Sequence, residues 1–318
     1  MLSPALKRTS TLVSGVVLAA ALTALSTPAA QASTSATHAS AHAVDAGNYV
    51  ALGDSYAAGA GVPGQSAGLC LRSDHNYGHL VAAALGSSSY TDVTCAAAKI
   101  KSITSAQYDA FIRVNDPQLN AVGPSTTLIT LGIGGNDLGT SDLGIADVIA
   151  ACVSGAVIDP FGTPCHNYYG HKYFNWSDWA WEYGDDTLVD RIDAAAPQLA
   201  DTLQQIHAKA PNARVVVVGY PEVLPADASS CAGRQPITVG DVSYLHGILG
   251  KVNSMLADTS AANGATFVDT TAATTGHDVC SDDRWIEGAL PGSPAVPFHP
   301  NATGERAMAD AVLAALGH

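Results

Sequence analysis

The chain has 318 residues, of which 28 are acidic and 14 are basic, giving a formal net charge of -14. Its 47% hydrophobic and 13% charged residues are typical of a folded domain with a sizeable core and exclude a disordered chain. Because clustered Lys and Arg are needed to bind phosphate backbones, neither nucleic acid nor an anionic membrane surface is expected as a partner.

The N-terminus has the three parts of a secretory signal peptide. Lys7 and Arg8 form a basic region, residues 11–25 are mostly apolar, and Ala30-Gln31-Ala32 supplies small residues for cleavage. We therefore predict that residues 1–32 are removed and that the protein is secreted to the extracellular space. The apolar run is shorter than the roughly 20 residues that span a bilayer, so no stable membrane anchor is expected.

Residues 33–48 form a small-residue tract without periodicity, and cleavage after Ala43 is an alternative within it. From Tyr49 onward the chain shows neither an internal repeat nor a linker between domains. A single domain over residues 49–318 is the simplest interpretation.

Short apolar runs alternate with longer helical patterns, which predicts an α/β fold with a parallel sheet. The expected strands are residues 49–52, 127–131, 214–219 and 266–269, with a less clear one at 92–94. Apolar residues at helical spacing predict three amphipathic helices. They are marked by Leu188, Ile192, Leu199, Leu203 and Ile206, by Tyr244, Ile248, Val252 and Leu256, and by Ala307, Ala311, Val312 and Leu316.

Residues 141–184 interrupt this alternation and are rich in aromatic side chains. Nine of the chain's twenty aromatic residues lie there: Phe161, Tyr168, Tyr169, Tyr173, Phe174, Trp176, Trp179, Trp181 and Tyr183. Two interpretations stay open, a local mini-core under a long insertion or an apolar wall for a ligand.

Six cysteines follow the signal segment: Cys70, Cys95, Cys152, Cys165, Cys231 and Cys280. An even number in an exported chain predicts three disulfides, although the sequence alone leaves 15 pairings open. Neither a Cys-x-x-Cys pair nor a zinc-like Cys/His spacing is present, so no metal site is expected.

A serine follows the first predicted strand, in Gly53-Asp54-Ser55-Tyr56. Open α/β sheets place their sites at the carboxyl ends of strands, so Ser55 is a candidate nucleophile if a base reaches its hydroxyl. It could equally cap the following helix. The segment is not a Gly-x-Ser-x-Gly elbow, because Ala57 occupies the position of the second glycine.

Two further segments carry candidate groups. Gly132-Ile133-Gly134-Gly135-Asn136-Asp137 follows another strand, and the Asn136 amide could donate to a developing oxyanion, although such turns are also ordinary loops. Phe298-His299-Pro300-Asn301 precedes the last helix and offers His299 as a base.

Together the Gly-Asp-Ser, Gly-x-Asn-Asp and His-Pro-Asn segments resemble the SGNH (GDSL) hydrolase superfamily over the whole mature chain. Residues 276–280 and the six cysteines are similar to its secreted bacterial lipase and esterase branch. The resemblance implies a three-layer α/β/α sandwich with a flavodoxin-like parallel sheet, and ester hydrolysis through an acyl-enzyme. It assigns Ser55 as nucleophile, His299 as general base, and the Ser55 backbone N–H and the Asn136 side chain to the oxyanion hole.

Two positions depart from the family pattern. The third oxyanion donor falls on the backbone N–H of Ala97, where the family usually has glycine; a positive φ there would cost about 1 to 2 kcal/mol. The family's catalytic Asp falls on Val296. The resemblance to branch members that lack this carboxylate suggests that the Val296 carbonyl orients His299. A distant carboxylate, from Asp278, Asp282 or Asp283, is the alternative.

The resemblance also implies sequential disulfides, Cys70 with Cys95, Cys152 with Cys165, and Cys231 with Cys280. The expected protein is a monomeric, secreted hydrolase of fatty-acyl esters, of lipase, esterase or phospholipase A type, that needs no metal or organic cofactor. A carbohydrate O-deacetylase would use the same residues. A catalytically inactive binding module on the same fold is the alternative of another class.

Overall fold

The computed structural model describes residues 47–109 and 111–318. The predicted signal peptide and nearly all of the small-residue tract lie outside the described residues. The first strand begins at Asn48, one residue before the predicted start of the folded domain.

The centre of the fold is a five-stranded sheet in the order β2-β1-β5-β8-β9, with every neighbouring pair parallel. The strands are β1 (Asn48–Gly53), β2 (Ser89–Asp92), β5 (Leu128–Gly132), β8 (Arg214–Val218) and β9 (Thr266–Val268). Four of them match the predicted strands closely, and the parallel α/β prediction is confirmed. The strand expected at 92–94 lies earlier, at β2, whose alternating exposure marks it as the polar edge of the sheet.

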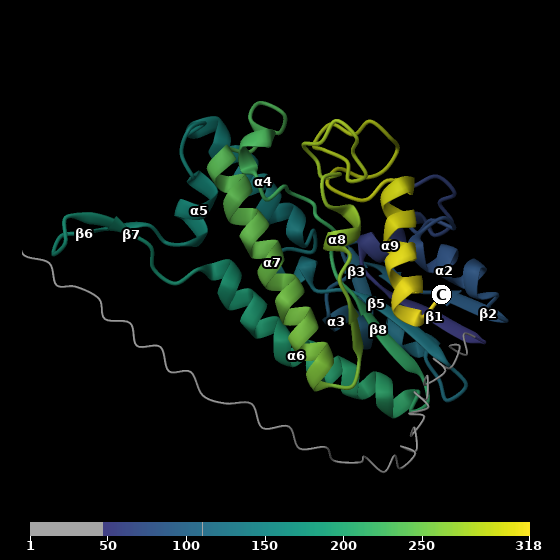
Figure 1. Ribbon diagram of the computed structural model, residues 1–318. Helices are drawn as coiled ribbons and strands as arrows, with labels where there is room; N and C mark the ends of the chain where they lie inside the picture. The colour runs from purple at the N-terminus through teal and green to yellow at the C-terminus, as the bar shows by residue number, and fades with distance from the viewer. Residues whose placement is uncertain (1–46, 110) are drawn as a thin grey trace, which may run out of the picture. The chain divides into compact units, whose positions relative to one another are not determined.

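Both faces of the sheet are covered because successive side chains of each strand point to opposite sides. Val50 and Leu52 belong to a core cluster with the apolar residues of α6 (Thr187–Lys209) and α7 (Val239–Ala262). Tyr49 and Ala51 belong to a second cluster with α2 (Tyr77–Leu85) and α9 (Ala302–Leu316). Figure 1 shows these two helix pairs on either side of the strands. The result is the three-layer sandwich that the resemblance implies.

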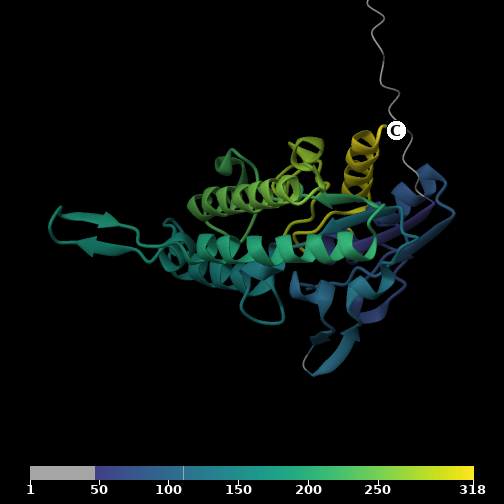
Figure 2. The same ribbon diagram turned by 90° about the horizontal axis from the view of Figure 1, so that it is seen from below.

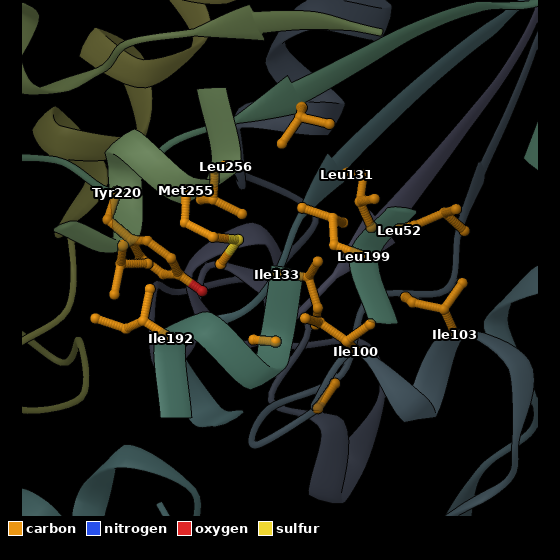
Figure 3. Close-up of a cluster of buried hydrophobic side chains, with 14 of the residues drawn as sticks. Leu52, Ile100, Ile103, Leu131, Ile133, Ile192, Leu199, Tyr220, Met255 and Leu256 are labelled. Atoms are coloured by element: carbon orange, nitrogen blue, oxygen red, sulfur yellow. The ribbon is translucent and has the colours of Figure 1, made fainter. Parts of the chain in front are cut away.

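The larger of the two clusters contains the predicted helix stripe of residues 188–206. Leu188, Leu199, Leu203 and Ile206 are fully buried, and α6 continues through Pro197. Figure 3 shows Leu199 facing Leu52 and Leu131 of the sheet. This packing fixes the sheet against α6, and it thereby fixes the loops that leave the carboxyl ends of the strands.

Shorter elements surround this frame. They are α1 (Ser55–Ala58), α3 (Lys101–Thr104), α4 (Ile145–Ile158), α5 (Pro164–Tyr169), α8 (Thr271–Thr274), β3 (Gln107–Asp109), β4 (Ile112–Asn115), β6 (Tyr173–Asn175) and β7 (Ala180–Glu182). Three disulfides are present: Cys152–Cys165 joins α4 to α5, and Cys70–Cys95 and Cys231–Cys280 join segments outside the elements named so far. The sequential pairing is therefore confirmed.

The aromatic insertion begins with α4 and α5 and ends in a β-hairpin, β6–β7, that extends away from the helices in Figures 1 and 2. Phe174 is in edge contact with Trp176, Trp179 and Trp181, and these three tryptophans are 65–76% exposed. Of the nine aromatic residues in the insertion, only Tyr169 belongs to the larger core cluster, the one that contains Val50 and Leu52. The mini-core interpretation is thus correct in that the rings pack on one another, but this cluster faces solvent instead of being covered.

Candidate active site

Ser55 lies at the carboxyl end of β1, in the tight connection to α1. Gly53 has φ +149°, and a Cβ there would meet the Gly132 carbonyl oxygen at 2.3 Å, so only glycine lets β1 and β5 approach this closely. The helix cap is Asp54, whose carboxylate accepts from the Tyr56 N–H at 2.9 Å. Ser55 is the first residue of the helix, so the alternative that it serves as the cap is wrong.

His299 lies against Ser55, although 244 positions separate them in the sequence. Its Nε2 is 2.7 Å from the Ser55 Oγ, and its Nδ1 is 2.8 Å from the carbonyl oxygen of Pro297. A carbonyl oxygen can only accept, so Nδ1 carries the proton and Nε2 is left with a lone pair. This is the tautomer that a general base needs to take the serine proton.

The expectation that the Val296 carbonyl orients His299 is wrong, because the Nδ1 faces the carbonyl of Pro297. The Val296 oxygen instead accepts from the backbone N–H of His299 at 3.1 Å, in the turn that leads to the histidine. The next carbonyl, that of Pro297, points at the ring. The three alternative carboxylates have other partners: Asp278 accepts from the Cys280 N–H, Asp282 from Arg234, and Asp283 lies beside His277.

Tyr56 holds the His299 ring in place. The two rings stack with centroids 4.5 Å apart, and the Tyr56 hydroxyl donates to the Phe298 carbonyl oxygen at 2.5 Å. Phe298 is itself in the left-handed region at φ +63°, so this bond supports a strained loop. Sequence reasoning did not assign a role to Tyr56, although its place directly after the serine was a signal.

Burial of the imidazole lowers the pKa of His299 to about 4, and the Pro297 carbonyl acts weakly in the opposite direction. The ring is only half-buried, so we expect the acid limb of the kcat/KM profile between about pH 4 and the ordinary histidine value of about 6.5. Activity should be lost only below that limb, because the base works in its neutral form. Initial rates on a soluble ester across pH measure this, and a midpoint above 6.5 would contradict the neutral orienter.

A second buried network joins the serine loop to the loop after β5. The Tyr220 hydroxyl donates to the Asp54 carboxylate at 2.5 Å and accepts from the Gly135 N–H at 2.7 Å. Burial raises the pKa of Asp54 to about 7, and the bond from Tyr220 partly offsets this. Tyr220 lies two residues after the end of β8, and this position near a strand end was the only sequence signal for it.

The resemblance assigns three N–H groups to the oxyanion hole, those of Ser55, Ala97 and the Asn136 side chain, and the structure shows what each of them bonds. Asn136 is buried; its Nδ2 donates one hydrogen to the Ala98 carbonyl oxygen at 3.0 Å, and its Oδ1 accepts from the Ile145 N–H. An amide nitrogen has a second hydrogen, which stays available. Within the described part of the chain, the backbone N–H groups of Ser55 and Ala97 donate to no acceptor. Ala97 adopts φ +60°, so the strain considered for a non-glycine residue is present.

An apolar cavity of about 800 Å³, counted with its open mouth, begins beside His299. Tyr56, Gly135, Tyr220 and Phe298 line it near the histidine. Farther along it is lined by Leu138, Ile145, Val148, Ile149, Leu188, Val223, Leu224, Ile237, Leu245, Ile248, Leu249 and Val252, which come largely from α4 and α7. None of the nine aromatic residues belongs to this lining, whereas Ile145, Val148 and Ile149 of the same insertion do, so the insertion contributes to the cavity wall through α4 and not through its aromatic rings.

Among the described residues, one group of possible metal ligands lies close together, Cys231, Asp278 and Cys280. The two cysteines are bonded to each other, and the carboxylate of Asp278 accepts from the Cys280 N–H. The donors of this group are thus already used within the protein.

A parallel α/β/α sandwich with a serine and a histidine in contact at its carboxyl edge is the arrangement of SGNH hydrolases. The chain belongs to this group, because the model of the GDSL-like Lipase/Acylhydrolase family matches residues 51–307. The protein is a carboxylic ester hydrolase of the lipase and esterase type, and the alternative of an inactive binding module is not supported.

The similarity to individual proteins extends over most of the chain. Lipase 2 of Streptomyces coelicolor is 39% identical over 100% of this chain and 99% of the relative. The crystal structure of phospholipase A1 from Streptomyces albidoflavus NA297 is 28% identical with a TM-score of 0.66, covering 84% of this chain and 98% of that one. The extracellular lipase from Streptomyces rimosus, at 24% identity and the same TM-score over 84% and 99%, shares the fold.

Proposed function

We propose that this protein is a secreted hydrolase of fatty-acyl esters that works through a Ser55–His299 dyad and an acyl-enzyme. The observation that supports it is the 2.7 Å contact between the His299 Nε2 and the Ser55 Oγ, at the mouth of an apolar cavity. A Ser–His pair can activate the hydroxyl, and the cavity offers an acyl chain a surface without charged groups.

The geometry suggests the following steps. His299 takes the hydroxyl proton of Ser55 as the Oγ attacks the ester carbonyl carbon, and the oxyanion accepts from the N–H groups of Ser55, Ala97 and Asn136. The intermediate collapses when His299 returns the proton to the leaving alcohol, which leaves an acyl-serine. Water then attacks the acyl-serine while His299 takes its proton, and His299 returns that proton to the Ser55 Oγ as the acyl C–Oγ bond breaks, which releases the carboxylic acid and restores the free enzyme. The Pro297 carbonyl stabilises the transient His299 imidazolium through its dipole and not through a full negative charge.

Export and a monomeric state belong to the same proposal. Disulfides form in oxidising compartments, and three are present here behind a predicted signal peptide of residues 1–32. In the described part of the chain, no helix is long and apolar enough to cross a membrane. Residues 49–318 would form the hydrolase domain. Since Ser55, Ala97, Asn136 and His299 come from one chain, the site needs no residue from a partner.

The test is a series of linear esters of increasing acyl length. Each methylene that enters the cavity can add about 0.8 kcal/mol, which is roughly fourfold in kcat/KM, until the cavity is filled. Ile149→Phe narrows the cavity and should reduce the preference for long over short esters at least tenfold. Ile158→Phe is the matched control, because this residue lies on the same helix but is 85% exposed.

Two outcomes of this experiment would contradict the proposal. If the rate is highest at acetate and acetylated sugars are hydrolysed, the protein is a carbohydrate O-deacetylase instead. If Ile149→Phe leaves the chain-length profile unchanged, the acyl chain does not enter this cavity.

A further inference from the structure

A second cavity, of about 430 Å³ with its mouth, is lined in part by Ala97, whose backbone N–H is one of the proposed oxyanion donors. Its lining contrasts with that of the apolar cavity, since it includes two ammonium groups, one carboxylate and one phenol ring. These belong to Lys99, Lys101, Asp142 and Tyr108, and the rest of the lining is Ala97, Ser102, Ala106 and Gln107. A cavity with this chemistry suits a polar, charged part of a substrate.

Each cavity is lined by a residue at or next to a proposed oxyanion donor. Ala97 lines the second cavity, and Gly135, the neighbour of Asn136, lines the apolar one. The 3.0 Å bond from the Asn136 Nδ2 to the Ala98 carbonyl joins the two walls. An ester carbonyl held by these donors would therefore have both cavities nearby, the apolar one for its acyl chain and the charged one for its alcohol part.

The charges of the second cavity are not neutralised by one another. No ion pair links Lys99 or Lys101 to Asp142 among the residues that the structure describes. The Lys99 Nζ donates to the Gly139 carbonyl oxygen at 2.7 Å, which orients it without cancelling its charge. Lys101 and Asp142 are exposed, and the Tyr108 side chain is 53% exposed. The Asp137 carboxylate attracts both lysines, but it forms no ion pair with either of them among the described residues, so both signs of charge remain available to a ligand.

We propose that this cavity binds the headgroup of a zwitterionic phospholipid, with the phosphate at Lys99 and Lys101 and the ammonium group at Asp142 and Tyr108. Ammonium donors favour phosphate oxygens, and a quaternary ammonium is attracted both to a carboxylate and to an aromatic face. A purely anionic headgroup would be repelled by Asp142, whereas an uncharged alcohol would leave all three charges unpaired. The inference rests on the proposed function, because it assigns the alcohol side of the same ester.

The experiment compares kcat/KM on monomeric dihexanoylphosphatidylcholine with kcat/KM on dihexanoylglycerol, at low salt. The wild-type protein should prefer the phospholipid, and added salt should weaken that preference through screening. Lys101→Ala should lower the phospholipid-to-glyceride ratio roughly three- to tenfold. Lys251→Ala removes the same charge from an exposed site on α7 and should leave the ratio as in the wild type.

Reversing the charge of Asp142 tests whether this carboxylate binds the ammonium group of the headgroup. Asp142→Lys should shift the preference from phosphatidylcholine toward the anionic dihexanoylphosphatidic acid. An unchanged ratio in Lys101→Ala, or equal falls in Lys101→Ala and Lys251→Ala, would overturn the headgroup assignment. If the wild-type protein hydrolyses the glyceride but not the phospholipid, the inference is wrong and the proposed function stands. Hydrolysis of neither ester by the wild-type protein would overturn both.

Discussion

Ser55→Ala and His299→Ala are each expected to lower kcat on a soluble ester by about 10⁴- to 10⁶-fold. The first change removes the proposed nucleophile, and the second leaves its proton without an acceptor, since the Ser55 Oγ is in contact with the His299 Nε2 at 2.7 Å. Because the two groups act as a unit, the double variant should be no worse than either single variant by more than a fewfold.

Two measurements separate this loss from misfolding. The far-ultraviolet circular dichroism and thermal midpoint of both variants should stay close to those of the wild type, and a fluorophosphonate should label the wild-type protein but not Ser55→Ala. Ser254→Ala, an exposed serine on α7, is the matched control and should keep full activity. Hydrolysis at a near-normal rate by either active-site variant would sink the dyad assignment.

Asn136→Ala is expected to lower kcat by about 10²- to 10³-fold, as the removal of one oxyanion donor does. The effect should fall mainly on kcat, because the second Nδ2 hydrogen is needed for the charge that develops in the transition state. The side chain also bonds Ala98 and Ile145, so some stability will be lost as well. Kinetics below the melting transition therefore have to be measured together with thermal unfolding.

Asn136→Asp distinguishes the two roles of this side chain. An aspartate keeps an oxygen for the Ile145 N–H but cannot donate to an oxyanion, and its charge opposes the one that forms. It should be at least as inactive as the alanine variant. If Asn136→Asp retains more than a tenth of the wild-type kcat, Asn136 is not an oxyanion donor.

The sheet could be predicted because buried parallel strands are continuous apolar runs, and β1, β5 and β8 are such runs. The edge strand β2 was misplaced because Ser89–Asp92 is polar and half exposed, so hydrophobicity gives it no signal. The contact between Ser55 and His299 followed from a family resemblance. Periodicity alone could not show it, since their separation in sequence is bridged only by the fold.

Other features depended on geometry that one sequence does not encode. Whether the Val296 or the Pro297 carbonyl reaches Nδ1 is decided by the turn around Phe298, where adjacent carbonyls point in different directions. The bond from Tyr220 to Asp54 spans two strand ends and has no local pattern. The aromatic insertion was recognised by composition, but composition does not determine whether a cluster of rings lies inside the domain or projects from it.

The projecting hairpin also determines what an optical experiment on this protein observes. The protein has four tryptophans. Trp176, Trp179 and Trp181 lie on β6–β7 or in the turn between these strands, and Trp285 stacks on His277. None belongs to the buried clusters, whereas the tyrosines Tyr49, Tyr77 and Tyr220 do. Tryptophan emission therefore reports mainly the solvent exposure and quenching of the hairpin, with a contribution from Trp285, and loss of the core is followed through tyrosine signals in the near-ultraviolet.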